Sequence, residues 1–314
     1  MSYQYLFGPV RSRRLGVSLG IDMVKSTICS LDCVYCECGR TATRTLRRKE
    51  YVAADAVIEE LTDYLGNSPA IDYVTFGGRG EPTLNSGLGR IVRFLKGAFP
   101  QYRCALLTNG TLFYLPEVRE EVLPFDLVLP NLDAVSEEAF AAINRPDPKL
   151  DNKLIIGGLA AFRREYRGTI WLEVFIVPGI NDTEAELSLL KAAASMIAPD
   201  RVQLNSLDRP GAFDWVTAAT AEHLESLAHF FAPLPVEIIV RTPPGSTGGT
   251  VGREGTVAPD AILSLLARRP STIEEISALT GLTVNRAEEV VAGLIADRSV
   301  VTQTVERRTF FRIA

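Results

Sequence analysis

Three closely spaced cysteines carry the clearest chemical signal in the sequence. Cys29, Cys33 and Cys36 follow a C-x3-C-x2-C pattern, and the aromatic residue Tyr35 directly precedes the third cysteine. Thiolates gathered in one short loop bind soft metals and iron–sulfur clusters, because each sulfur is a soft donor and little loop entropy remains to be lost. A closed structural metal site needs four protein ligands, one more than these three. The pattern therefore predicts a four-iron cluster with one iron left open to another ligand.

The other two cysteines allow a second interpretation. Cys38 follows the trio by two residues, so the loop could instead form a four-thiol zinc knuckle, or Cys38 could be a bystander or a neighbour of the cluster. Cys104 lies in an apolar stretch, where a free thiol packs as a small hydrophobic side chain. A long chain without a secretory leader gives little reason to expect disulfides. We keep the cluster as the prediction and zinc as its alternative.

Polar turns follow two of the predicted strands. The turn at 77–81 reads G-G-R-G-E, in which Gly78 or Gly80 lets the backbone approach a ligand closely and Glu81 can accept hydrogen bonds from an ammonium group. A later Thr-Asn-Gly turn contains Asn109, whose amide suits a ribose or an amino-acid contact. By themselves a glycine-rich turn and an Asn-Gly turn need no function. We nevertheless expect ligand contacts here because the cysteine trio precedes both turns.

Three more polar residues lie at or near predicted strand ends. Asp133 could accept hydrogen bonds from ribose hydroxyls, hold substrate, or cap the helix that follows. Glu173 is surrounded by apolar residues, and because a buried unpaired charge is costly, its carboxylate should point into a lumen. Asn205 follows the next strand and should lie at the mouth of that lumen. Glu173 and Asp133 are therefore the predicted catalytic residues, and Asn205 is a predicted cavity residue.

These motifs resemble those of the radical S-adenosylmethionine (SAM) enzymes, whose signature is C-x3-C-x-aromatic-C. The resemblance implies that Cys29, Cys33 and Cys36 hold a 4Fe–4S cluster and that the amino and carboxylate groups of SAM occupy the open iron. It also implies that an electron from the reduced cluster splits SAM into methionine and a 5′-deoxyadenosyl radical, which takes a hydrogen atom from the substrate. The implied electron donor is a protein such as ferredoxin or flavodoxin. The residues expected to contact the cofactor are Tyr35, Gly78, Gly80, Glu81, Asn109, Asp133 and Asn205.

Longer segments are similar to one branch of that superfamily, the wyosine-synthetase-like iron–sulfur oxidoreductases. They include F-G-P-V-x-S-R-R-L-G-x-S-L-G near the start and V-P-G-I-N-D later, and the likeness spans residues 7–211. Wyosine synthases act on a guanine base of tRNA with the help of a second cluster, whereas this chain has no cysteine before Cys29 to hold one. The likeness therefore suggests a tRNA base as substrate without implying the wyosine reaction. A peptide or a small metabolite is the alternative substrate.

The elements that would position these residues alternate between strand and helix. Alternation begins at Leu15 and recurs about every thirty residues, which predicts parallel βαβ units and an α/β fold. Six or seven units suffice for the partial (β/α)6 TIM-type barrel that the resemblance implies, with the chemistry at the carboxyl ends of the strands. The later strands are expected at 73–76, 103–107, 127–129, 169–177, 201–204 and 236–240, and the helices at 53–66, 87–98, 116–122, 149–165, 183–196 and 218–231.

A second, smaller domain is expected at the C-terminal end. Proline and glycine are frequent in 242–250, which predicts a linker at 242–256 between a barrel domain at 1–241 and a domain at 257–314. Helices expected at 258–267, 272–279 and 284–296, followed by alternation at 299–313, resemble a winged helix-turn-helix. Residues 256–314 have seven basic and seven acidic residues, so peptide recognition or packing on the barrel competes with nucleic-acid binding through the third helix.

Charge and composition limit the possible functions. The chain has 314 residues and a net charge of −5, but residues 1–50 contain nine Lys or Arg and only four Asp or Glu. This basic lip could receive an anionic substrate or RNA, or could be an ordinary solvated surface. Only two histidines are present, which argues against histidine-based zinc hydrolysis and a Ser-His-Asp triad. No apolar run reaches the ~18 residues that span a bilayer, and no signal peptide is visible, so we expect a cytoplasmic protein without a membrane partner.

Two other classes of function compete with a radical SAM enzyme. One is a regulator that senses iron or redox state through its cluster and binds nucleic acid through the C-terminal domain. The other is a binding protein stabilised by zinc. Cleavage of SAM would separate the enzyme from the regulator, and metal analysis would expose the zinc protein.

Overall fold

The computed structural model describes residues 3–239, 259–305 and 308–314. The chain forms two compact units. The larger unit contains Met1–Val34, Arg40–Leu207 and Val216–Val240, and the smaller unit contains Tyr35–Gly39, Asp208–Trp215 and Arg241–Ala314. The predicted linker at 242–256 lies outside the described residues.

An eight-stranded sheet organises the larger unit, with the strand order β1-β2-β5-β6-β7-β8-β9-β10. β1 is antiparallel to β2, and the other neighbouring pairs of this sheet are parallel. A mostly parallel sheet that follows chain order confirms the predicted α/β class. The strands are β1 (Leu6–Ser12), β2 (Gly16–Asp22), β5 (Tyr73–Gly77), β6 (Arg103–Thr108), β7 (Leu127–Pro130), β8 (Thr169–Phe175), β9 (Arg201–Asn205) and β10 (Val236–Ile238).

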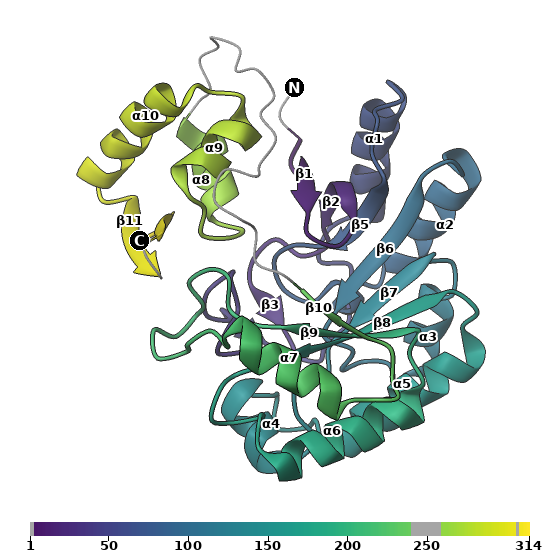
Figure 1. Cartoon of the computed structure of the whole chain (residues 1–314). Coiled ribbons are helices and arrows are strands. Elements are labelled where there is room, and N and C mark those ends of the chain that lie inside the picture. The colour runs from purple at the N-terminus through teal and green to yellow at the C-terminus, as the bar shows by residue number, and fades with distance from the viewer. Residues whose placement is uncertain (1–2, 240–258, 306–307) are drawn as a thin grey trace. The chain divides into compact units, whose positions relative to one another are not determined.

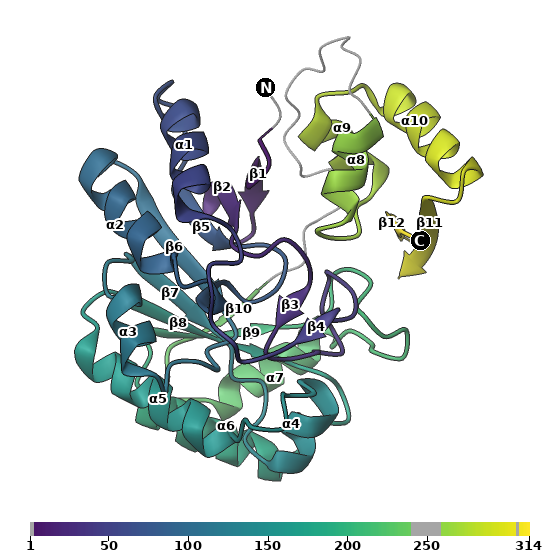
Figure 2. The ribbon, with the colours of Figure 1, turned by 180° about the vertical axis from the view of Figure 1, so that it is seen from behind.

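Helices connect the parallel strands and cover the outer side of the curved sheet (Figures 1 and 2). The predicted strands and helices of this unit are all present, with ends that shift by a few residues. The helices are α1 (Ala54–Leu65), α2 (Leu88–Ala98), α3 (Pro116–Val122), α4 (Glu137–Ile143), α5 (Asn152–Glu165), α6 (Glu184–Ile197) and α7 (Ala221–Phe230). A short additional pair, β3 (Ile28–Cys29) and β4 (Thr43–Arg44), carries the start of the cysteine loop.

Several elements of the larger unit lie outside the predicted ranges, among them β1, β3, β4 and α4. β1 contains Pro9 and a change of register between Phe7 and Val10, which hide a strand pattern but are tolerated because β1 lies at the sheet edge. α4 is only seven residues long, too short for a clear helical period. It starts because the Ser136 side chain accepts a hydrogen bond from the backbone N–H of Ala139. Ser136, not Asp133, is thus the helix cap.

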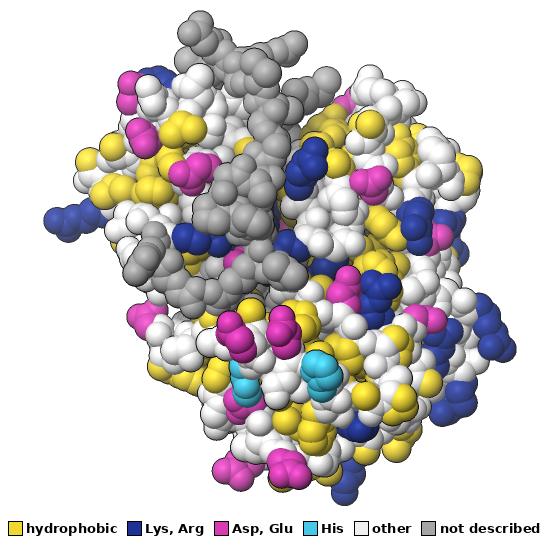
Figure 3. Space-filling model, viewed as in Figure 1, with side chains coloured by type: hydrophobic (Ala, Val, Ile, Leu, Met, Phe, Trp, Pro, Cys, Tyr) yellow, Lys and Arg dark blue, Asp and Glu magenta, His cyan; other side chains and the backbone are white. Residues whose placement is uncertain are grey.

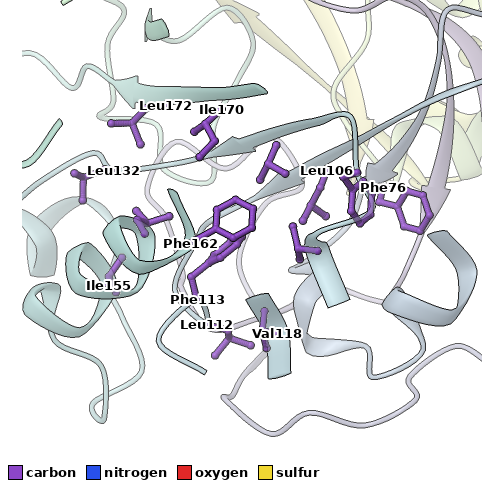
Figure 4. Close-up of a cluster of buried hydrophobic side chains, with 14 of the residues drawn as sticks. Phe76, Leu106, Leu112, Phe113, Val118, Leu132, Ile155, Phe162, Ile170 and Leu172 are labelled. Carbon is purple, nitrogen blue, oxygen red and sulfur yellow. The ribbon is translucent and has the colours of Figure 1, made fainter. Parts of the chain in front are cut away.

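Apolar residues on one face of the sheet pack against the helices. Because strand residues alternate between faces, Phe76 and Leu106 share this side with helix and loop residues such as Phe113 and Phe162 (Figure 4). The rings of Phe113 and Phe162 lie 4.6 Å apart. Cys104 belongs to the same core and is fully buried, which confirms its prediction as a small hydrophobic residue, and burial raises the pKa of its thiol to about 12.

The opposite face of the sheet has its own, smaller apolar cluster. Leu15, Tyr73, Ala105, Leu127 and Leu129 are buried there together. Towards the carboxyl ends of β8 and β9, three buried residues on this face are polar. They are Glu173, Gln203 and Asn205. The inner face therefore changes from apolar to polar in the direction in which the strands run, so the buried polar side chains lie towards their carboxyl ends.

The smaller unit contains three helices and a hairpin, where the sequence predicted them. They are α8 (Pro259–Leu266), α9 (Ile273–Thr280), α10 (Val284–Ala296), β11 (Val300–Val305) and β12 (Arg308–Ile313), with β11 antiparallel to β12. Thr272 and Glu275 form a capping box at the start of α9, and Gly281 ends this helix with a positive φ of 74°. Ile262, Ile276, Val291 and other apolar residues form its core.

A buried ion pair fastens the smaller unit internally. Arg209 and Glu275 are 5% and 4% exposed, and both nitrogens of the Arg209 fork donate to the Glu275 carboxylate at 2.5 Å. Arg209 Nη1 also donates to the carbonyl oxygen of Pro270 at 3.1 Å. Although burial alone would raise the pKa of Glu275, the hydrogen bonds and charge of Arg209 hold it below the usual value. The segment Asp208–Trp215 is thus tied to α9 by a bidentate charged contact.

Candidate active site

The cysteine loop begins at the end of β3. Cys29 is the last residue of β3, and Cys33 follows it in the larger unit. Tyr35 and Cys36, the predicted aromatic contact and third ligand, belong to the smaller unit's segment Tyr35–Gly39. No disulfide joins any of the five cysteines, all of which lie in the described part of the chain.

Asp32 holds this loop in shape. Its carboxylate accepts hydrogen bonds from the backbone N–H of Thr41 at 2.8 Å and from Arg40, and it pairs with Arg145 at 3.3 Å. Its own backbone N–H donates to the carbonyl oxygen of Asn144 at 2.9 Å. These bonds fix the loop against the end of α4, and they bring Asn144 beside Cys33.

The glycine-rich turn after β5 packs directly on the cysteine strand. Gly78 and Gly80 both have positive φ angles, 105° and 71°. A Cβ atom at Gly80 would overlap the carbonyl oxygen of Ile28, and one at Gly78 would overlap the Asp22 carboxylate. The backbone N–H of Glu81 donates to the Ile28 oxygen at 2.9 Å. Both glycines are therefore needed for close approach, and the nearest neighbours in this structure are protein groups.

Glu81 is buried and surrounded by donors. It is 2% exposed, and its Oε1 accepts from Thr83 N at 2.9 Å and from the hydroxyls of Thr83 and Thr108, each at 2.6 Å. Its Oε2 accepts from Asn109 N at 2.8 Å. Burial raises the pKa of Glu81 although these hydrogen bonds act in the opposite direction. The carboxylate thus joins the turn after β5 to the end of β6, and its part in seating SAM stays a prediction.

Asn109 connects the end of β6 to Cys29. Its Nδ2 donates to Cys29 Sγ at 3.3 Å and to Ser30 Oγ at 2.9 Å. Its Oδ1 accepts from the backbone N–H and the hydroxyl of Thr111 at 3.0 and 2.8 Å. The predicted cofactor contact therefore lies beside a predicted cluster ligand, Cys29, and the nitrogen and oxygen of its amide are both engaged.

Asp133 is the centre of a second set of contacts. It is 3% exposed, and its carboxylate accepts from Asn144 Nδ2 at 2.7 Å and from the backbone N–H of Phe175 at 2.9 Å. Asn144 Nδ2 also lies 3.4 Å from Cys33 Sγ. A cavity of about 10 Å³, the space of one water molecule, lies between these loops. Its polar lining is Asn109, Thr111, Asn131, Asp133, Asn144 and Asn152.

Glu173 occupies the polar part of the sheet's inner face. It is 8% exposed and forms an ion pair with Arg14, which lies in the turn between β1 and β2. Its Oε1 accepts from Asn131 Nδ2 at 3.2 Å and from Asn205 Nδ2 at 3.4 Å. Asn131 Nδ2 also lies 3.4 Å from Asp133 Oδ1. The structure thus brings Glu173 and Asn205 together, Asn131 links Glu173 to Asp133, and Asn144 links Asp133 to Cys33.

The two histidines lie away from these contacts. Both belong to α7, and Figure 3 shows them in cyan at the surface beside acidic side chains. His223 Nε2 is 2.9 Å from Asp182 Oδ2, and His229 is exposed.

The residues around the sulfurs fit an iron–sulfur cluster. Cluster thiolates accept hydrogen bonds from amide groups, and the donors here include Leu31 N and Asn109 Nδ2 on Cys29 and Asn144 Nδ2 on Cys33. The nearby Asp32 carboxylate is offset by Arg40 and Arg145. The donor set therefore suits a soft, negatively charged centre.

Comparison with known proteins identifies the class. A model of the radical SAM superfamily matches residues 23–191, so the chain belongs to the radical SAM superfamily. It is accordingly an enzyme that uses a 4Fe–4S cluster and SAM. Among crystal structures, a radical SAM methyltransferase from Sphaerobacter thermophilus aligns with a TM-score of 0.54 and 17% identity, over 70% of this chain and 65% of that one. Streptococcus suis SuiB bound to SAM aligns with a TM-score of 0.53 and 11% identity, over 70% and 50%. These similarities concern the fold.

Relatives narrow the family further. A UPF0026 protein of Methanocaldococcus jannaschii is 36% identical over 229 residues, which are 72% of this chain and 70% of the relative. A UPF0026 protein of Helicobacter pylori (strain J99) is 33% identical over 272 residues, 86% of both chains. These matches place the chain among the UPF0026 proteins.

One relative is much longer than this chain. A Brachyspira hyodysenteriae protein named GTPase Obg is 35% identical over 301 residues, which are 96% of this chain but 44% of that protein. The present sequence contains no Gly-Lys pair, which the phosphate-binding loop G-x4-G-K-[ST] requires.

In the part of the chain that the structure describes, no helix is long and apolar enough to cross a membrane.

Sequence reasoning missed Asn144, Asn131 and Arg14. Asn144 meets Cys33 across 111 residues of sequence, and Arg14 meets Glu173 across 159. Both had been part of the segments that resemble the wyosine-like branch, and this was the one signal that could have marked them.

Proposed function

We propose that Cys29, Cys33 and Cys36 hold the cluster and that the radical chemistry acts on a base of RNA, with tRNA as the expected substrate. The observation that carries the substrate proposal is the exposed positive charge beside the cysteine loop. Arg40 and Arg145 have side chains 56% and 39% exposed, and the exposed Arg44 donates to the carbonyl oxygen of Arg145 at 2.9 Å. RNA binds such groups through its phosphates, with release of counterions.

Further basic residues extend this surface. Arg47 and Lys49 are both exposed and follow Arg44 within five residues. The basic residues of this surface are thus Arg40, Arg44, Arg47, Lys49 and Arg145. Against their five positive charges, the Asp32 carboxylate, which faces Arg40 and Arg145, contributes one negative charge. An anionic polymer is therefore the substrate class that this part of the larger unit favours.

Residues of the larger unit would divide the work. When bound, the cluster supplies the electron that splits SAM and starts the radical reaction. Gly78 and Gly80 would allow the SAM amino group to reach the turn that Glu81 holds in place, and Asn109 and Asn205 would contact the rest of the cofactor. Glu173, oriented by Arg14, and Asp133 would accept hydrogen bonds from substrate or ribose and exclude water from the radical.

The smaller unit supports a recognition role. Its three helices and hairpin follow the order of a winged helix-turn-helix, and we include this module, at 257–314, in the proposal. Thr283 caps α10, the helix that would face a ligand, and Arg286 in its first turn is exposed. Because the module has no net positive charge, it would add specificity for RNA or a protein partner rather than raw affinity.

The test uses anaerobically reconstituted full-length protein. We expect about four irons and four sulfides per chain, and release of 5′-deoxyadenosine with dithionite that rises when tRNA is added. Cys33→Ala should lose the iron and the nucleoside, whereas Cys104→Ala, which removes a thiol from the apolar core, should keep both.

Binding of tRNA separates the alternatives. Replacement of Arg44 by Ala should weaken binding and lower the slope of log affinity against log salt by about one. A failure of the protein to retain tRNA at low salt would overturn the RNA proposal and favour a peptide or small metabolite. Zinc without iron, or RNA binding without SAM cleavage, would overturn the assignment of the cysteines or the catalytic role.

A further inference from the structure

Two asparagine side chains contact two of the proposed cluster cysteines. Asn109 Nδ2 lies 3.3 Å from Cys29 Sγ, and Asn144 Nδ2 lies 3.4 Å from Cys33 Sγ. The asparagines follow different elements, β6 and α4, and all four residues belong to the larger unit. Each of these cysteines therefore has its own side-chain amide donor.

The orientation of each side-chain amide is fixed by a partner that can act only as a hydrogen-bond donor or only as an acceptor. Asn109 Oδ1 accepts from the backbone N–H of Thr111 at 3.0 Å, and because this group can only donate, Nδ2 must be the atom that faces Cys29. Asn144 Nδ2 donates at 2.7 Å to the Asp133 carboxylate, and because a carboxylate can only accept, the atom that faces it must be the nitrogen. One hydrogen of each NH₂ group is thus used within the protein, on Ser30 or Asp133, and the other is directed at sulfur.

We propose that Asn109 and Asn144 set the reduction potential of the bound cluster by donating N–H···S hydrogen bonds to Cys29 and Cys33. The inference rests on the proposed role of these cysteines as ligands. One-electron reduction by a low-potential donor, such as dithionite or a reduced flavodoxin, adds negative charge to the sulfur ligands, and no bond of the protein forms or breaks. An N–H dipole directed at sulfur stabilises this added charge, so the two asparagines make reduction easier.

The two bonds differ in their surroundings. Asn144 is 3% exposed and lies between Cys33 and the carboxylate of Asp133, whereas Asn109 is half-buried. A hydrogen bond is electrostatically stronger where water is excluded, and loss of Asn144 would also remove the donor that lies between Cys33 and the Asp133 carboxylate. The effect of Asn144 should therefore be the larger.

The test is a redox titration of reconstituted protein followed by electron paramagnetic resonance. Leu has nearly the shape of Asn without its donor, so Asn109→Leu and Asn144→Leu should shift the potential to more negative values. We expect about a tenfold change in the reduction equilibrium, about 59 mV for one electron, and more for Asn144→Leu. Asn181→Leu is the matched control, because Asn181 is buried and donates only to the carbonyl oxygens of Asp133 and Phe175 among the described contacts. Its potential should match that of the wild type.

The outcomes separate this inference from the assignment of the ligands. Wild-type potentials in both Leu variants, with full iron content, would overturn the inference while Cys33→Ala still loses its cluster. A full cluster in Cys33→Ala would instead overturn the ligand assignment. Should Asn144→Leu fail to fold, Asn109→Leu decides alone, because its half-buried turn tolerates the change more readily, and an unchanged potential there overturns the inference.

Discussion

Two buried glutamates of this protein have side-chain pKa values that are shifted in opposite directions. Glu81 in the larger unit and Glu275 in the smaller unit are 2% and 4% exposed. Burial acts on both to raise the pKa, yet the pKa of Glu81 is raised and that of Glu275 is lowered. Glu81 meets only neutral N–H and O–H donors, whereas Glu275 meets the guanidinium of Arg209. A full positive partner outweighs desolvation, and four neutral hydrogen bonds do not.

The comparison indicates different roles for Glu275 and Glu81. Glu275 is a structural anion, because its charge is matched inside its own unit. Glu81 joins two loops of the site while its charge remains unmatched, so it can respond to a cation brought by a ligand. The SAM amino group, for which sequence reasoning selected Glu81, would be such a cation.

The strongest test of this contrast is the replacement of Glu275 by Gln. Loss of the carboxylate leaves the Arg209 charge buried and unpaired, and breaking a buried pair in this way costs about 3–5 kcal/mol. Hydrogen exchange of α9 amides should accelerate accordingly. The matched control is Glu289→Gln in the pair with Arg286, whose side chains are 63% and 53% exposed, where we expect less than about 1 kcal/mol. Equal effects of the two changes would contradict the structural role of Glu275.

Replacement of Glu81 by Gln should have a smaller effect on stability. The amide keeps one acceptor oxygen but presents an NH₂ group to buried donors, so at least one donor is left unsatisfied at a cost of about 1–3 kcal/mol. Chemical denaturation would measure it, with Glu165→Gln in an ion pair 43% exposed on the Glu165 side as control. If Glu81→Gln is as costly as Glu275→Gln, the distinction between the two residues is wrong.

The pH dependence of stability should have opposite signs at the two sites. Because the folded-state pKa of Glu275 lies below 4.5, its contribution is present above that pH and is lost as the pH falls through the lowered pKa. The folded-state pKa of Glu81 lies above 4.5, so its contribution is greatest below that pH and declines as the pH rises through the raised pKa. The difference between wild type and each Gln variant, measured by thermal unfolding across this range, should change in opposite directions. Parallel curves would contradict the comparison.

The sequence predicted the scaffold better than the contacts. Period-two and helical patterns identified the parallel strands because one face of the sheet must be apolar against the helices, as Phe76 and Leu106 are. Edge strand β1 was missed because Gly8 and Pro9 resemble a turn or loop. Motifs and positions at predicted strand ends selected Asn109, Asp133, Glu173 and Asn205. The structure connects Glu173 to Asp133 through Asn131, and Asp133 to Cys33 through Asn144.

Local sequence patterns did not identify these connecting residues, for a physical reason. An asparagine that meets a cysteine 111 residues away has no local pattern of its own, because its role depends on where the chain returns. The same holds for Arg14, since a charged residue in a surface turn has the same local sequence whether it faces solvent or the interior.

The pair of Arg14 and Glu173 also measures the curvature of the sheet. Arg14 enters from the start of β2 and Glu173 lies on β8, and the order β2-β5-β6-β7-β8 places four strand spacings between them. Along the sheet this distance is about 19 Å, far more than one side chain can span in a flat sheet. The ion pair therefore crosses the concave side of a curved sheet, and the reach of these two side chains limits how far the start of β2 can lie from β8 across that side.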